Sequence, residues 1–301
     1  YDFCLRRPPS VPLRLACKAW EEAWRHPATT WLREVVGAES LAPVGEADLE
    51  ARSLGTWSHA WLARALNPGG GVQFVPAPEA GAAMAAVCGA AEAARDRAGA
   101  IFREVGRELP ILWEAVWRRA LWAARVMCEE ALDEPGGFLG TEWHLPEDCH
   151  VDVGDGPVLR LRGRVDLIRS ETPRFGGPVT VIDFKTGAEL RLTPAEIRDG
   201  RGLQVVLYGE AMRELGAEAV TLRIVRPEGG RVSRAMGRDQ IAAQLRALCQ
   251  MQDTGIFGVR GAMCEEFGYR PTYPMATLPT PEDINDARWG LTHGGDGGEA
   301  P

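Results

Sequence analysis

The segment VTVIDFKTG, residues 179–187, combines the pattern of a buried β-strand with two charged residues, Asp183 and Lys185. Alternate residues of a strand share a face, so we expect both charged side chains on the same side of a sheet. The chain has 34 lysine and arginine residues in total, and only Lys18 and Lys185 are lysines. A lysine where arginine is the rule indicates that this position needs an ammonium group.

Further strand-like segments surround this one. FLGTEWHL at 138–145 and VLRLRGRVDLI at 158–168 precede it, and TLRIVRP at 221–227 follows a helix that the pattern predicts over 194–215. Short Gly/Pro turns favour antiparallel pairing among the first strands, whereas the helix leaves room for a crossover to the next one. The sequence therefore predicts an α/β fold with a small mixed β-sheet flanked by helices.

The N-terminal half is predicted to be largely helical. Aromatic pairs at i,i+4 spacing, Trp57 with Trp61 and Trp113 with Trp117, indicate core packing rather than platforms for stacking bases. Helices are expected over 13–36 with a break near Pro27, and over 47–66, 78–99, 109–132 and 238–252.

The composition is that of an ordinary globular protein, with 45% hydrophobic and 25% charged residues. No run of 18 apolar residues exists, so we expect no membrane span. The seven cysteines are scattered, which disfavours a disulfide framework or a structural zinc site and favours a reducing, cytoplasmic location. The start, YDFCLRRPPS, lacks an initiator Met and a signal-peptide pattern, so we expect a piece of a longer polypeptide.

The charge is unevenly distributed. The net charge is −8, but residues 155–246 carry 16 basic and 12 acidic side chains. A local positive field attracts polyanions more effectively than the total charge suggests.

Polar residues gather on three predicted elements. Asp166 lies in the strand GRVDLI, Asp183 and Lys185 lie in VIDFKTG, and Gln204 and Tyr208 lie four residues apart on one side of the helix. Two buried carboxylates and a lysine are costly unless they are paired or hold a cation. Oxygen donors with room for water suit Mg²⁺ or Mn²⁺, and the lysine can orient or deprotonate an attacking water. The alternative is a structural Asp–Lys pair at a strand end.

This pattern, D…DxKTG…QxxxY, resembles the PD-(D/E)XK nuclease superfamily in its RecB-like branch, which includes the nuclease domains of RecB and AddA/AddB and the Cas4 exonucleases. The resemblance covers roughly residues 26–290. It extends to LGTWSHAWL, in which His59 matches a histidine that completes the metal site of that branch.

The resemblance implies a role for each matching residue. His59, Asp166, Asp183 and the backbone carbonyl of Phe184 are expected to hold the metal, with Lys185 as the catalytic lysine.

Gln204 and Tyr208 are expected to position the substrate strand or the lysine. Glu142 matches an acidic position of the family, although a solvated strand-end glutamate explains it equally well. Arg164 is expected to contact a phosphate, or to be an exposed cation.

One departure concerns the iron–sulfur cluster of many RecB-like nucleases. The segment HPATTWL has His26 where the first cysteine ligand would stand, and only Cys264 remains near the C-terminus. One cysteine cannot hold a cluster, so we expect none. The C-terminal segment is expected either to dock through aromatic residues and a proline or to be a plain surface tail; those residues are Tyr269, Tyr273, Pro274 and Trp289.

We therefore expect one nuclease domain over 1–301, with a helical arm at 13–135, a catalytic core at 136–252, a docking segment at 253–293 and a disordered tail at 294–301. The expected activity is metal-dependent hydrolysis of DNA, as an exonuclease on single-stranded ends, and the expected nucleic-acid partner is single-stranded DNA or the ends of a duplex. No Walker A motif occurs, so this segment is not itself a motor. The resemblance implies a helicase domain or subunit as the partner that separates the strands. The alternatives are an inactive nuclease-fold module that binds DNA or a partner, and a hydrolase of small phosphoesters.

Overall fold

The structure is a computed structural model, and it describes most of the chain up to residue 257. The C-terminal segment from 258 onward, which includes the predicted docking residues and Cys264, lies outside the described residues. The helix over 46–52 is described without its side chains. The described residues are Leu5 and the ranges 7–38, 46–69, 73–134, 136–154, 158–186, 191–228, 230–235 and 237–257.

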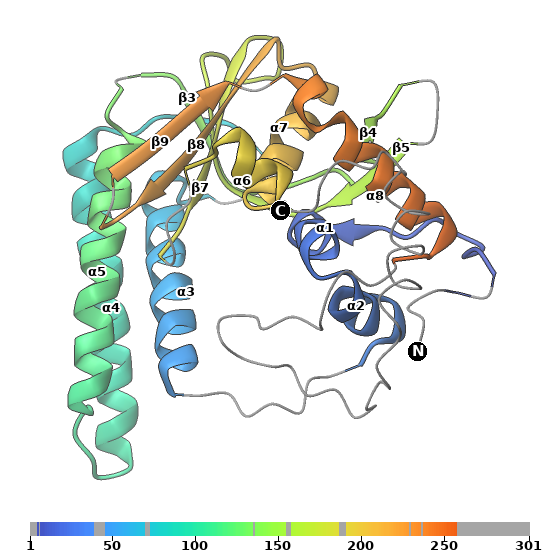
Figure 1. The fold of residues 1–301 in the computed structure, drawn as a ribbon. Coiled ribbons are helices and arrows are strands. Elements are labelled where there is room, and N and C mark those ends of the chain that lie inside the picture. The colour runs from blue at the N-terminus through green and yellow to red at the C-terminus, as the bar shows by residue number, and fades with distance from the viewer. Residues whose placement is uncertain are drawn as a thin grey trace.

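The core is a mixed β-sheet of six strands in the order β2-β3-β6-β7-β8-β9 (Figure 1). β3, β6 and β7 pair antiparallel, β7 and β8 pair parallel, and β8 and β9 pair antiparallel. This order confirms the predicted small mixed sheet. The strands are β2 (Val75–Pro76), β3 (Phe138–His144), β6 (Arg164–Ser170), β7 (Pro178–Phe184), β8 (Ala219–Arg226) and β9 (Gly230–Ala235).

The single strand predicted over 158–168 is wrong, because the chain changes sheets at Gly163. β5 (Val158–Arg162) pairs with β4 (His150–Asp152) and with β1 (Leu15–Ala16) in a separate three-stranded sheet. A side chain at position 163 would meet the Tyr208 ring at 2.8 Å, so glycine permits the close approach. β1, β2 and β4 went unpredicted because two or three residues show no periodicity, and β9 was also missed.

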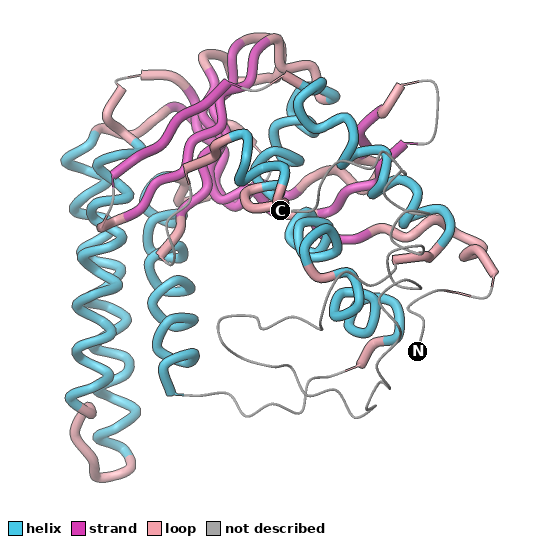
Figure 2. Tube along the Cα trace, viewed as in Figure 1, coloured by secondary structure: helices cyan, strands magenta, loops and turns pink. Residues whose placement is uncertain are grey.

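Helices cover both faces of the main sheet (Figures 1 and 2). On one face, α3, α4 and α5 share a core with Leu139, Leu167 and Ile182. On the other face, α1, α7 and α8 share a core with Ile168 and Val181. These helices span Cys17–Arg25 (α1), Glu46–Leu66 (α3), Ala80–Glu104 (α4), Ile111–Ala131 (α5), Leu203–Glu214 (α7) and Ala242–Thr254 (α8).

The helix predicted over 194–215 forms in two pieces, α6 (Pro194–Arg198) and α7. Gly200 and Gly202 separate them with φ angles of 83° and 80°, in the left-handed region that glycine adopts readily. α7 then returns the chain to β8, which confirms the crossover. The predicted helix over 238–252 likewise begins as a 3₁₀ turn, η2 (Arg238–Ile241), before α8.

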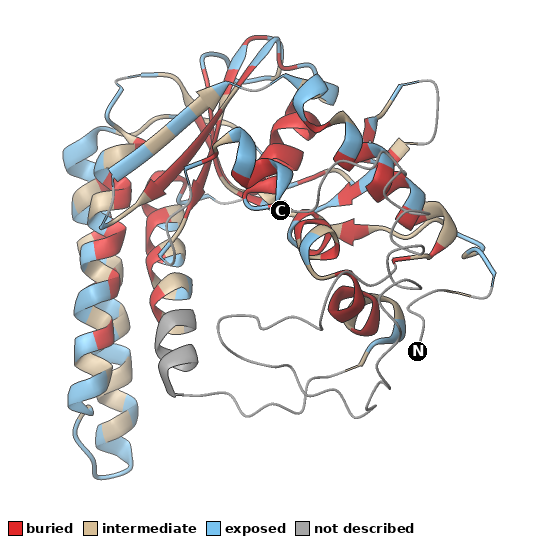
Figure 3. Ribbon diagram, viewed as in Figure 1, coloured by how far each residue is buried: buried red, intermediate tan, exposed pale blue. Residues whose placement is uncertain are grey.

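The helical N-terminal half is confirmed, including the break near Pro27: α1 is followed by α2 (Pro27–Thr30) and the π-helical turn η1 (Trp31–Val36). Trp57 packs against Trp61 and Trp113, with ring centroids 6.2 and 5.3 Å apart, as expected for core aromatics. The distal half of the α4–α5 hairpin extends past the sheet and is largely exposed (Figure 3). Among the described residues, no helix has the length and apolar character needed to cross a membrane.

Two glycines allow a matched test of how tightly α7 packs on β8. A Cβ at Gly209 would lie 2.6 Å from Leu222 Cδ2 in the core, whereas a Cβ at Gly89 on α4 meets nothing within 4 Å. We expect Gly209→Ala to lower the free energy of unfolding by about 1–3 kcal/mol through overpacking. Gly89→Ala is expected to raise it by about 0.5–1 kcal/mol through helix propensity. Urea unfolding measures both; equal effects would contradict the close packing of α7 on β8.

Candidate active site

The site forms where β6 and β7 diverge at one end of the main sheet. The antiparallel register pairs Leu167 with Ile182, which places Asp166 and Asp183 opposite one another at the next position. There the backbone ladder gives way to a side-chain contact, because the Phe184 amide donates to Asp166 Oδ2 at 2.9 Å. The two carboxylates that the sequence singled out are therefore brought together by strand pairing.

Asp183 and Lys185 form an ion pair at the end of β7. Lys185 Nζ lies 2.9 Å from Asp183 Oδ2, and the Asp183 residue is only 3% exposed. Oδ2 has no well-directed hydrogen bond, so this buried oxygen has only the nearby ammonium to compensate it. Burial raises the pKa of Asp183 to about 6, although the charge of Lys185 works in the opposite direction.

Lys185 is held in place from α7. Gln204 Oε1 accepts a hydrogen bond from Lys185 Nζ at 3.2 Å, and Gln204 Nε2 donates to the Tyr208 hydroxyl at 3.3 Å. Burial opposes the charged lysine, but Asp183 outweighs it and raises the pKa of Lys185. The predicted Gln–Tyr pair at i,i+4 thus contacts the lysine as one connected network.

Sequence reasoning missed Glu21, which supports this network from α1. Its residue is 6% exposed, and Oε2 accepts from the Gln204 backbone amide at 2.9 Å in the first turn of α7. The other oxygen, Oε1, lies 3.0 Å from Nζ of the half-exposed Lys18. A carboxylate at a helix N-terminus satisfies an unpaired amide and complements the helix dipole. The only sequence signal was an acidic residue on the apolar face of a helix.

A second group of donors lies on the other side of Asp166. His59 from α3, Glu142 from β3 and Asp166 each offer one ligand atom, and these atoms lie within 4.8 Å of one another. His59 Nδ1 is 3.7 Å from Asp166 Oδ1, and its ring packs edge-on to Phe184 with centroids 5.9 Å apart. Predicted residues from three separate segments therefore converge, with Glu142 among them.

Glu142 reaches this group through an unusual backbone conformation. Its φ is 48°, and the register, which pairs Thr141 with Leu167 and Trp143 with Val165, places it opposite Asp166. A left-handed non-glycine residue costs about 1–3 kcal/mol and clusters at functional sites. Arg164 Nε lies 2.5 Å from Glu142 Oε2, so the arginine predicted to contact phosphate is paired with a carboxylate here.

The charges of this donor group depend strongly on one another. Burial opposes ionisation of Asp166, but His59 and the Phe184 amide outweigh it and lower the pKa of Asp166. In the same way, burial opposes the imidazolium of His59, whereas Asp166 raises the pKa of His59 overall. Burial raises the pKa of Glu142. Metal ligands must be deprotonated, so a divalent cation that bound here would displace the protons held by this group.

The donor set suits a hard divalent cation. The imidazole of His59 and the carboxylates of Asp166 and Glu142 converge. The buried Asp183 Oδ2 has no well-directed hydrogen-bond partner. These are ligand types that Mg²⁺ and Mn²⁺ accept. The predicted role of the Phe184 carbonyl stays a prediction, because the contact seen for Phe184 is that of its amide.

Comparison with known families agrees with this site. The family model for the PD-(D/E)XK nuclease superfamily matches residues 27–272, and the chain belongs to that superfamily. The match covers α3 with His59, both strands with the aspartates, and α7. No curated protein matches the sequence. Membership indicates a nuclease, a hydrolase of phosphodiester bonds, and the donor group is consistent with metal dependence.

Burial of Asp183 predicts how stability depends on pH. Its folded pKa of about 6 exceeds the usual value of 3.8, so protonation favours the folded state, and this contribution is lost as pH rises through 6. Asp183→Asn removes this titration, and it also leaves the Lys185 ammonium without its carboxylate partner. In EDTA we expect the stability of the variant relative to that of the wild type to rise by about 2 kcal/mol between pH 4 and pH 7.5.

Urea unfolding at several pH values measures this difference. Asp96→Asn, at an exposed position of α4, is the matched control for the substitution. A difference that stayed constant from pH 4 to pH 7.5 would show that Asp183 is not held at a raised pKa.

Glu21 can be tested by its effect on α7. Glu21→Ala removes the acceptor for the Gln204 amide and should cost about 0.5–2 kcal/mol, as the loss of a helix cap does. Glu21→Gln keeps an acceptor oxygen and should recover at least half of that loss. Thermal unfolding measures the loss of stability in the two variants. Equal destabilisation would show that the hydrogen bond to the Gln204 amide does not stabilise α7.

Proposed function

We propose that the chain is a metal-dependent deoxyribonuclease of the RecB-like branch. The observation that carries this proposal is the convergence of His59, Glu142 and Asp166 beside Asp183 and a lysine held by Gln204. The same motif order, D…DxKTG…QxxxY with an upstream histidine, supports the branch. The intact aspartates and lysine disfavour the inactive binding module.

The reaction is proposed to be hydrolysis of a phosphodiester bond by water, leaving a 5′-phosphate and a 3′-hydroxyl. When bound, Mg²⁺ or Mn²⁺ supplies Lewis-acid polarisation and a water of lowered pKa. His59, Glu142, Asp166 and Asp183 would hold the cation.

Lys185 contributes a fixed positive charge. Its ion pair with Asp183 keeps it an ammonium, so it stabilises negative charge that develops on the phosphoryl group rather than removing a proton. Gln204 and Tyr208 restrict its position through the hydrogen bonds described above, and Glu21 fixes Gln204 in turn. A preorganised charge of this kind needs no rearrangement during the reaction.

The wider role proposed here is exonuclease action on single-stranded DNA ends, within a helicase–nuclease system of repair, recombination or defence in the cytoplasm. The basic excess over 155–246 supports a polyanionic substrate. A helicase domain or subunit is the proposed partner, because strand separation needs a motor.

End-labelled DNA tests the activity. We expect degradation of single-stranded DNA in Mg²⁺ or Mn²⁺, none in EDTA, and loss of activity in Asp183→Ala. Lys185→Arg should slow cleavage by about 100-fold or more, since a guanidinium cannot occupy the same hydrogen-bonded position. The position of the label in the products gives the polarity.

The chain offers a matched control in its other lysine. Lys18→Arg keeps the ion pair with Glu21 at a half-exposed position, so its rate should stay within about threefold of the wild type. If the wild type were as inert as Asp183→Ala in every metal, the inactive binding module would replace the nuclease.

A further inference from the structure

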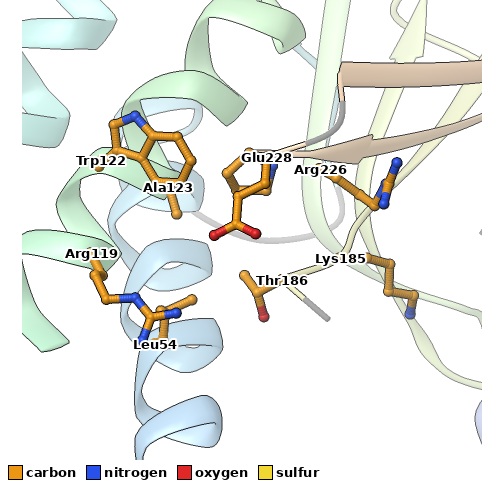
Figure 4. A pocket seen from close by; sticks show the side chains of 9 residues that line it. Leu54, Arg119, Trp122, Ala123, Lys185, Thr186, Arg226 and Glu228 are labelled. Atoms are coloured by element: carbon orange, nitrogen blue, oxygen red, sulfur yellow. The ribbon is translucent and has the colours of Figure 1, made fainter. Parts of the chain in front are cut away.

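A pocket open to solvent lies on the far side of Lys185 from α7, between α3, α5 and the end of β8. It is shallow: the space between its residues measures about 410 Å³ when open solvent is counted, and the cavity itself measures about 50 Å³. Figure 4 shows Arg119 and Trp122 projecting from α5 toward this space, with Thr186 and Glu228 facing them. The pocket therefore adjoins the catalytic lysine without using any of the metal-binding residues.

Trp122 is unusual among the described aromatic residues. It is the one aromatic side chain among the large apolar residues that are exposed in the described part of the chain, with 46% of its surface accessible. Its neighbours Ala123 and Ala124 on α5 are buried, so the helix places this indole at the edge of its core face. Trp117, by contrast, donates its indole N–H to the Ala91 carbonyl at 2.8 Å and packs within the arm.

The pocket is lined by more basic than acidic side chains. Arg119 and Arg226 line it together with Glu228, and the ammonium of the adjoining Lys185 is paired with Asp183. Cations close to an accessible aromatic face are the combination with which proteins bind unpaired nucleic acid: the cations follow the backbone and the ring stacks with a base.

We propose that this pocket binds one unpaired nucleotide of the DNA strand that is cleaved, with its base against Trp122 and its phosphate facing Arg119. A base inside a duplex has both faces covered, so this contact requires a single strand. Glu228 fits the same arrangement: it repels phosphate but accepts hydrogen bonds from base N–H groups, and every base offers at least one.

This inference rests on the proposed nuclease function and gives the reason for its preference for single strands. Phosphates repeat along a strand, so a nucleotide seated beside Lys185 holds a neighbouring phosphate near the lysine and the metal ligands. The pocket would thus position the strand for cleavage rather than take part in the reaction.

Binding measured without cleavage tests the pocket separately from the chemistry. Fluorescence anisotropy in EDTA would compare labelled oligo-dT of about 15 nucleotides with a duplex of equal length. Trp122→Ala should weaken binding of the single strand by about 10-fold, and Trp122→Phe by clearly less, because phenylalanine keeps a stacking face. Duplex binding should change by less than about twofold.

Two further variants sharpen the test. Arg119→Gln should reduce the slope of log affinity against log salt concentration by about 0.7, the value for one lost phosphate contact on a single strand. Leu112→Ala is the control, since this exposed residue lies on the same helix away from the pocket and should bind oligo-dT like the wild type.

The outcomes separate the pocket from the nuclease. If Trp122→Ala bound oligo-dT within about twofold of the wild type, or lost as much affinity for duplex, the proposed subsite would be wrong even where cleavage is metal-dependent. If the wild type cleaved nothing but lost single-strand affinity in Trp122→Ala, the subsite would stand and the nuclease would fall.

Discussion

Asp183 is a carboxylate in the interior of the protein, and the surrounding structure is organised around compensating its charge. An isolated buried carboxylate costs several kcal/mol, which Lys185 offsets at 2.9 Å. The lysine in turn needs its own fixed partners, and Gln204 supplies one. Gln204 lies in the first turn of α7. Its backbone amide donates to Glu21 of α1, a residue 183 positions earlier in the chain. A single buried charge thus ties β7, α7 and α1 together.

The same constraint explains why helices are needed on both faces of the sheet. α1 and α7 cover the face that holds the lysine in position, while α3 brings His59 to Asp166 from the other face. Neither face alone assembles both the ammonium and the metal donors. The site lies where β6 and β7 part, and there the Asp166 side chain takes the place of a backbone acceptor for the Phe184 amide.

Lys185 also divides the site into two chemical environments. On one side, His59, Glu142 and Asp166 bring together three side chains that could hold a metal ion. On the other, Arg119 and Trp122 face the pocket from α5. The proposed substrate, a phosphodiester strand, would suit this division. Its phosphates would be attracted to the cations, and only the reacting phosphate would approach the candidate metal ligands. The division also accounts for a chain of net negative charge that has a polyanion as its proposed substrate.

The sequence by itself determined the elements whose geometry is local. Strand alternation placed Asp183 and Lys185 on one face, helical spacing placed Gln204 beside Tyr208, and short turns gave the antiparallel strands that bring Asp166 to Asp183. Only the tertiary structure decided the rest. Glu142 lies among the candidate metal ligands with a left-handed backbone conformation. Glu21 contacts Gln204 because α1 packs on α7. Trp122 faces a pocket formed by α3, α5 and the end of β8. Local periodicity does not indicate which distant segment packs against a side chain, because those contacts depend on how the helices pack on the two faces of the sheet.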